Sequence, residues 1–232
     1  MLYNKMRVRE WKVMLKISQR VIEFVKKELA YDVTGHDFYH AERVAKRGVR
    51  LYQEETKEAP NAEGEMIVEL ASYLHDVIDE KVVADTRDNS KKITTLLKEE
   101  GLSETQIDEV FYIMEHMSYS KNLEKKYDLS LEGKCVQDAD RLDALGAIGI
   151  ARTFSYGGSH NRKLYDPTED KSKNETYEAY RNQKGSSVAH FYDKLLGLAD
   201  TMNTPSGQEL AEKKTEYMKV YLTQFMAEWD GE

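Results

Sequence analysis

The sequence is short of the residues that interrupt helices and of those that form disulfides. It contains three prolines and one cysteine in 232 residues. With Cys135 alone, no disulfide can form within the chain, which fits a reducing compartment. With so few prolines, long helices are possible along most of the chain. These two shortages favour a helical protein of the cytoplasm.

Long apolar runs and basic tracts are also missing. No apolar stretch approaches the roughly 20 residues that a helix needs to cross a bilayer. The first fifteen residues hold no apolar segment of signal-peptide length. The net charge is −8, from 34 Lys and Arg against 42 Asp and Glu, so a nucleic-acid duplex is not an expected partner. We therefore expect a cytoplasmic protein without membrane contact.

Amphipathic helices account for most of the pattern that is present. Apolar residues recur at steps of three and four, and no alternating strand pattern competes with them. The length is enough for one large domain or two small ones. We predict an all-α fold, a compact helical bundle. The predicted helices are about Glu10–Leu29, Phe38–Glu55, Ala62–Ile78, a segment starting at Asn89 or Ser90, one capped by Ser103 and Gln106, one or two within 130–158, Ser187–Met202 and Pro205–Trp229.

Ionisable residues follow the most apolar turn of the third predicted helix, where His75 and Asp76 come directly after Leu74. Burying a charged aspartate there is costly without a partner. A divalent metal would be that partner, and imidazoles with carboxylates suit a transition metal. Neighbouring residues on a helix point about 100° apart, so both can reach one ion only where the backbone adapts at the helix end. Further candidates are His40, Asp138, Asp140 and Asp143.

These residues lie in segments that resemble a known family. HAERV (40–44), LHDVID (74–79), QDADRLDALGAIGIARTFSYGG (137–158) and HFYDKLL (190–196) resemble the HD-domain metal-dependent phosphohydrolases, in particular a bacterial subgroup of nucleotide pyrophosphohydrolases. The resemblance implies one HD-type domain over 1–232, with a core at about 36–145 and C-terminal helices, 146–232, packing on it. It also implies one divalent ion (manganese, nickel, cobalt or magnesium) with four protein ligands. These are His40, His75, Asp76 and Asp140.

The activity that the resemblance implies is hydrolysis of a phosphoester or phosphoanhydride bond. The substrate would be a nucleotide or another small phosphorylated molecule, and a nucleoside triphosphate would release pyrophosphate. Asp79 and Glu80 are the candidates for activating water. Other HD hydrolases carry Glu-Asp at this spacing and this chain carries the reverse order, so which residue acts stays open. Both can also be solvated carboxylates at a helix end.

An acidic protein that binds a polyanion needs local positive charge. Two cations near the motifs are Arg141 and Arg152. His36 caps the second helix or contacts substrate, and His116 lines the pocket or only ends a helix. The substrate-binding candidates are therefore Lys81, Arg43, His36, His116, Arg162 and Lys163.

Residues around the motifs leave several interpretations open. Asp143, three residues after Asp140, can hydrogen-bond a ligand histidine. Asp138 or Asp140 can instead be a helix N-cap. His190 is a pocket residue or a core residue, and these two are not separated by the sequence.

Two other functions and a question of assembly stay open. One alternative is an HD-fold di-iron oxygenase, which needs extra histidines between the His75–Asp76 pair and Asp140. Only His116 lies in that interval. Another alternative is a catalytically inactive nucleotide-binding module. A homodimer is one oligomeric state that we keep open.

Overall fold

A computed structural model describes residues 17–30, 32, 35–79, 82–83, 85–169 and 185–232. These residues form helices joined by loops, and none of them lies in a β-strand. The predicted all-α fold is therefore confirmed. The helices are α1 (Gln19–Glu28), α2 (Phe38–Glu55), α3 (Ala62–Leu74), the 3-10 helix η1 (His75–Ile78), α4 (Thr86–Glu99), α5 (Glu104–His116), α6 (Tyr119–Glu124), α7 (Leu131–Asp143), α8 (Gly146–Ser159), α10 (Ser187–Asp193), the 3-10 helices η2 (Leu195–Gly197) and η3 (Ala199–Thr201), and α11 (Pro205–Asp230).

Side-chain caps fix where several helices begin. Asp37 accepts a hydrogen bond from the backbone N–H of His40 at the start of α2. Ser103 and Gln106 form the predicted capping box of α5. Pro205 opens α11, where its missing N–H costs nothing. The sequence predicted each of these three helix starts.

Other predicted boundaries were wrong, each for a local reason. The fourth helix is capped by Asp85, which lies four residues before Asn89 and five before Ser90, the two predicted caps. The alternative that Asp138 or Asp140 is a helix N-cap is excluded, because both lie inside α7, whose cap is Ser130. The segment 187–202 is three short helices, because the backbone leaves the helical region at Lys194. Residues 10–16 of the first predicted helix lie outside the described residues.

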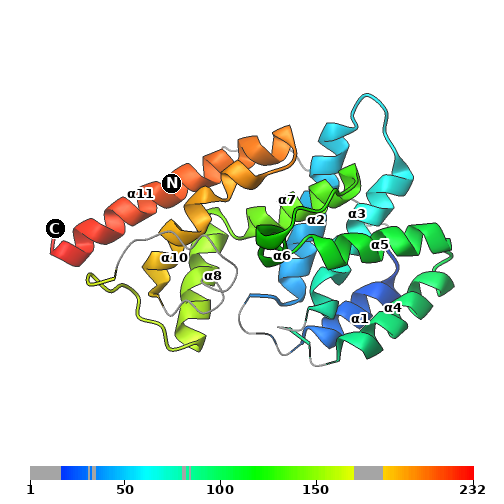
Figure 1. Cartoon of the computed structure of the whole chain (residues 1–232), viewed down its shortest axis with the longest axis horizontal. Coiled ribbons are helices and arrows are strands. Elements are labelled where there is room, and N and C mark those ends of the chain that lie inside the picture. The colour runs from blue at the N-terminus through cyan, green and yellow to red at the C-terminus, as the bar shows by residue number, and fades with distance from the viewer. Residues whose placement is uncertain (1–16, 31, 33–34, 80–81, 84, 170–184) are drawn as a thin grey trace, which may run out of the picture.

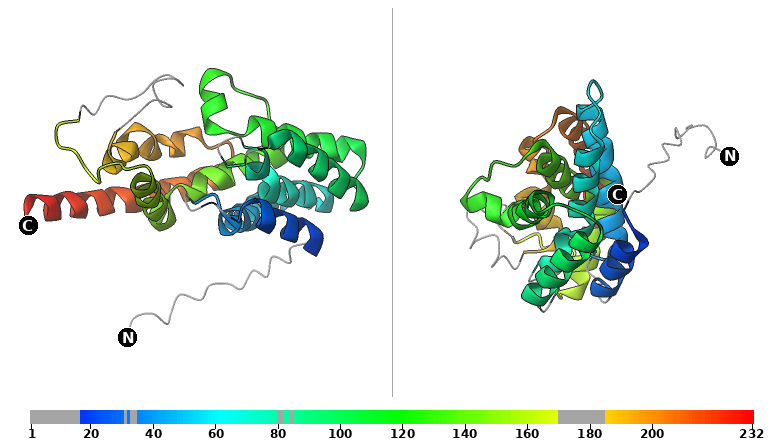
Figure 2. Two further views of the ribbon diagram at one scale, coloured as in Figure 1. Left: turned by 90° about the horizontal axis from the view of Figure 1, so that it is seen from below. Right: turned by 90° about the vertical axis from the view of Figure 1, so that its right-hand side faces the viewer.

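Helices α2, α3 and α7 pack on one another and form the centre of the molecule. Figure 1 shows α8, α10 and α11 grouped toward one end and α1, α4 and α5 toward the other. Figure 1 and the left view of Figure 2 show that the molecule is elongated, with α11 running along its long direction. Along the described part of the chain, no helix has both the length and the apolar character needed to span a membrane.

Candidate metal centre

The first histidine is placed by the beginning of α2. Asp37 caps that helix, and its carboxylate accepts from the backbone N–H of His40 at 2.8 Å. Ala41 and Val44, on the apolar face of the same helix, are fully buried in the core. His40 itself is 0% exposed. The cap and the apolar face therefore hold an imidazole inside the molecule at a fixed depth.

His75 and Asp76 lie where α3 tightens into a 3-10 helix. The α-helix ends at Leu74, and His75–Ile78 forms η1, whereas the sequence predicted one helix up to Ile78. A 3-10 helix has three residues per turn, which changes the angle between neighbouring side chains. Asn89 of α4 donates to the carbonyl of Val77 at 2.9 Å and supports this turn. The backbone therefore adapts at the helix end, as a shared site for two adjacent residues requires.

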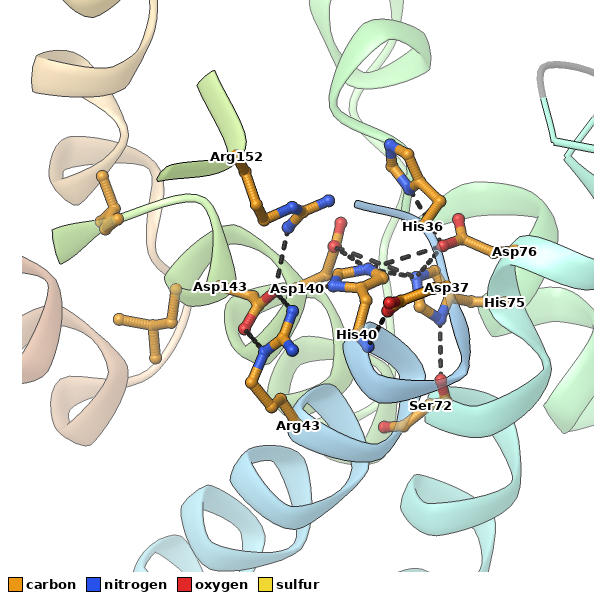
Figure 3. Close-up of polar contacts among 12 residues, drawn as sticks. His36, Asp37, His40, Arg43, Ser72, His75, Asp76, Asp140, Asp143 and Arg152 are labelled. Atoms are coloured by element: carbon orange, nitrogen blue, oxygen red, sulfur yellow. Dashed lines mark hydrogen bonds and ion pairs between the residues drawn. The ribbon is translucent and has the colours of Figure 1, made fainter. Parts of the chain in front are cut away.

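Four donor atoms from these elements and from α7 meet at one point (Figure 3). Nε2 of His40 lies 3.3 Å from Nε2 of His75 and 3.5 Å from Oδ2 of Asp76. Nε2 of His75 lies 3.3 Å from the same Asp76 oxygen. Oδ1 of Asp140 is 3.4 Å from His40 Nε2 and 3.9 Å from His75 Nε2. The structure thus brings together the four residues predicted as metal ligands.

These separations fit a single ion. Ligand bonds of about 2.1 Å place neighbouring donors about 3.0–3.5 Å apart around an octahedral or tetrahedral centre. Each histidine also has its other ring nitrogen occupied. Nδ1 of His75 is 2.7 Å from the carbonyl of Ser72, which can only accept, so Nδ1 carries the proton. Nε2 of His75 therefore keeps a lone pair directed at the cluster.

Asp143 holds the proton on Nδ1 of His40, as the carbonyl of Ser72 does for His75. Its Oδ2 accepts from Nδ1 of His40 at 2.7 Å, which is the contact predicted for a carboxylate three residues after Asp140. Two arginines donate to Asp143 as well. Arg43 uses Nε and Nη2, at 2.8 and 2.9 Å, and Arg152 uses Nη1 at 3.0 Å. Asp143 therefore stays ionised and fixes the tautomer of His40 with Nε2 toward the cluster.

In the cluster, burial and the neighbouring charged groups shift each pKa in opposite directions. Burial alone would raise the pKa of the Asp76 carboxyl, but His75 and His36 outweigh burial and hold that pKa well below its usual range. Burial would lower the pKa of His40, yet the hydrogen bonds to Asp140 and Asp143 raise it to about 9. A buried group of carboxylates and imidazoles is thus stabilised by shared positive charge, the role that a cation would take over.

Four of the other predicted site residues fall into three groups. His36 joins the cluster, since its Nδ1 is 3.0 Å from Oδ2 of Asp76, and it could hold a metal together with His40 and Asp76. Asp79 is half-buried directly after η1. Glu80 and Lys81 lie outside the described residues.

Other predicted contacts lie elsewhere. His116, at the end of α5, packs on the rings of Tyr112 and Tyr127. Lys163 is an exposed residue paired with Asp166, and Arg162 lies over the ring of Tyr156. The structure does not bring His116 or Lys163 into the donor cluster. Their proposed contacts with substrate, and that of Arg162, stay predictions.

Two groups that support the site could not be placed from sequence patterns. Asn89 contacts η1 from a different helix, and Arg152 reaches Asp143 from α8. Arg152 stood out only as one of several cations near the motifs. No spacing rule links either residue to the ligands, because both contacts depend on how separate helices pack.

Comparison with known proteins agrees with this geometry. A family model described as "HD domain" matches residues 37–145. YpgQ of Bacillus subtilis is 34% identical over 218 residues, which is 94% of this chain and 96% of YpgQ.

Solved structures give the same result. An HD-superfamily hydrolase from Bacillus thuringiensis is 41% identical with a TM-score of 0.68, covering 92% of this chain and 96% of that one. The structure of Bacillus subtilis YpgQ in complex with ADP is 33% identical with a TM-score of 0.69, covering 91% and 97%. The match over nearly the whole length, together with the four convergent donors, shows that this chain belongs to the HD-domain superfamily of metal-dependent hydrolases.

Proposed function

We propose that this protein is a metal-dependent phosphohydrolase acting on nucleotides or other small phosphorylated molecules, with release of pyrophosphate from nucleoside triphosphates as its specific form. The observation that carries the proposal is the meeting of four donors from three separate segments, His40, His75 with Asp76, and Asp140. A buried cluster of this kind is costly to a fold unless it binds a cation.

The donor set fits one divalent ion. Two imidazoles and two carboxylates suit manganese, nickel or cobalt better than magnesium. When bound, such an ion lowers the pKa of water and polarises a phosphoryl oxygen. The chain's own residues orient the ligands: Ser72 and Asp143 fix the protons of the two imidazoles. Asp79, directly after η1, and Glu80 are the proposed acceptors of the proton from the attacking water.

A nucleotide substrate is supported by a relative. YpgQ of Bacillus subtilis has been solved with ADP. We extend this to the present chain as a proposal, because a divalent ion and a nearby arginine suit the charge of a phosphate chain.

The test is a panel of nucleotides and phosphoesters, assayed with manganese, nickel, cobalt and magnesium in turn. Products are separated so that phosphate release is distinguished from pyrophosphate release. We expect pyrophosphate and a nucleoside monophosphate from at least one triphosphate. No turnover of any phosphorylated compound with any of these ions would contradict the proposal.

The geometry gives little room for the di-iron alternative. His36, His40 and Asp76 form one possible metal group, and His40, His75 and Asp140 form another. Both groups use His40, whose Nδ1 is bound to Asp143. One free ring nitrogen binds one ion, so the two groups are overlapping choices for a single metal. One metal per chain by elemental analysis is the expected result.

A further inference from the structure

Two arginines donate to Asp143, but they do so differently. Arg43 of α2 directs both Nε and Nη2 at the carboxylate. Arg152 of α8 directs only Nη1 at it. Among the described residues, Arg152 therefore keeps guanidinium donors that Asp143 does not use. Arg43 is a bidentate partner of Asp143, whereas Arg152 has hydrogen-bonding capacity to spare.

The position of Arg152 depends on a glycine. Gly35 has φ +100, and a methyl group added to it would lie 2.8 Å from Nε of Arg152 and 3.1 Å from its Cγ. The side chain of Arg152 thus packs directly on the backbone of Gly35. The next residue, His36, contacts Asp76. The turn at Gly35 and His36 forms one edge of the donor cluster, and Arg152 lies at that edge.

This edge is the open side of the cluster. The side chains of His40, His75 and Asp76 are buried, at 0%, 6% and 6% exposed. Those of Asp140 and His36 are 31% and 36% exposed. Figure 3 shows Arg152 extending from α8 toward the cluster. A ligand from solvent would reach the donors past the residues of this edge.

Arg152 is the better placed of the two arginines to bind an anion at this edge. The single carboxylate of Asp143 is shared by both guanidinium groups. Arg43 is held in a bidentate pair, whereas Arg152 makes one hydrogen bond to Asp143 and can bind an anion as well, in a protein whose net charge is −8.

We propose that Arg152 binds a phosphoryl group of the substrate at the open edge of the metal centre, and that Gly35 is required because any side chain there would displace the guanidinium. The inference rests on the proposed function and adds to it the residue that recognises the anion. A guanidinium offers paired N–H donors that match the oxygens of a phosphate or pyrophosphate group.

The test is calorimetric titration of the manganese-loaded protein with inorganic phosphate and, separately, with ADP. We expect Arg152→Gln to weaken both by about ten- to a hundredfold, the effect of losing a charge-assisted hydrogen bond. Arg43→Gln is the comparison variant: it also removes a donor from Asp143 but none from the open edge, so it reports any loss that acts through Asp143 and His40. It should weaken phosphate binding less than Arg152→Gln does. Circular dichroism and metal content establish that each variant is folded and loaded.

Gly35→Ala gives a second, independent measurement. It should weaken phosphate binding as Arg152→Gln does, and the two changes together should be no worse than either one. Gly101→Ala is its control, because Gly101 has φ +87 with nothing within 4 Å of the added methyl group. It carries the same backbone strain without the contact, and should bind phosphate normally.

The outcomes separate the inference from the function on which it rests. If wild-type protein binds phosphate and ADP but Arg152→Gln binds them equally well, the assignment of Arg152 is wrong and the proposed function stands. If Arg43→Gln weakens binding as much as Arg152→Gln, Arg152 acts only through Asp143 and the inference fails. If the loaded wild-type protein binds neither ligand, both the inference and the proposed function are overturned.

Discussion

Two ring nitrogens decide which atoms of the centre can reach an ion. Nδ1 of His40 donates to Asp143, and Nδ1 of His75 donates to the carbonyl of Ser72. The two supports differ, since one is a side chain that can be changed and the other is backbone. The contribution of a fixed tautomer to metal binding can therefore be measured at His40.

Asp143→Asn should weaken metal binding by about ten- to a hundredfold. The amide keeps the shape of the side chain but removes the charge that holds the proton on Nδ1 of His40 and pairs with Arg43. Calorimetric titration with manganese measures the loss. Asp166→Asn, which removes an exposed ion pair with Lys163, is the control and should bind manganese like wild type. Equal affinity in Asp143→Asn would show that the tautomer of His40 needs no such support.

Ligands and proton acceptors should respond differently to substitution. His75→Ala or Asp76→Ala removes a donor atom, so we expect loss of the ion and of all turnover. Asp79→Asn or Glu80→Gln should slow turnover while one metal stays bound, because neither residue is a proposed ligand. Elemental analysis beside the hydrolysis assay distinguishes the two classes. Metal loss in the second pair would place those residues among the ligands.

At the scale of elements, the centre depends on a short 3-10 helix. Asn89 donates to the carbonyl of Val77 within η1, and Asn89 is buried. Removing the amide leaves a buried carbonyl without this donor, at a cost of about 1–3 kcal/mol. Because η1 carries His75 and Asp76, the cost should appear in the metal site as well as in stability.

We therefore expect Asn89→Ala to lower both the free energy of unfolding and the affinity for manganese. The matched control is Asn122→Ala, which removes an amide that donates to the carbonyls of His116 and Ser118. That change should lower stability without weakening the metal. Denaturant unfolding and calorimetry measure the two quantities. Asn89→Ala with a normal manganese affinity would mean that η1 holds its shape without α4.

Elements formed by local sequence signals could be predicted, and elements that depend on contacts with other helices could not. The start of α2 at Phe38, after its cap Asp37, and that of α5 after Ser103 are encoded locally, by a cap and an apolar period. The change from α3 to η1 at His75 is not, because the helical pattern continues to Ile78 and the supporting amide comes from α4. Within the site, by contrast, the role of Asp143 could be predicted, because it lies three residues after Asp140 on one helix. The contact of Arg152 with Gly35 joins two separate segments, which no local pattern reveals.

At the scale of the whole molecule, the metal centre lies where the central helices meet. Helices α2 and α7 carry His40 and Asp140, and α11 packs on both of these helices. We predicted one domain over the whole chain, and binding of metal should then stabilise all of it at once. Chelation with EDTA should lower the melting temperature of a single calorimetric transition. Two transitions, of which one ignores EDTA, would mean that 146–232 unfolds separately.

His190 of α10 should make the stability of the protein depend on pH in a way that is separate from the metal centre. Burial lowers the pKa of its imidazole to about 3, with the charges of Lys194 and Arg162 acting in the same direction. In the unfolded chain the pKa of histidine is about 6.5. Below that pH the unfolded state takes up a proton that the folded state refuses, so stability falls as the pH drops from about 6.5 toward 3.

The expected loss from this group between neutral pH and pH 5 is at most about 2 kcal/mol. His190→Gln stays neutral at every pH, so the difference in unfolding free energy between wild type and variant isolates the histidine from the carboxylates that also titrate. Urea unfolding at pH 7.5, 6 and 5 measures it. The variant should lose less stability than wild type over this range. Parallel losses in the two proteins would show that His190 takes up its proton in the folded state, and that α10 opens to water more readily than its packing on α8 indicates.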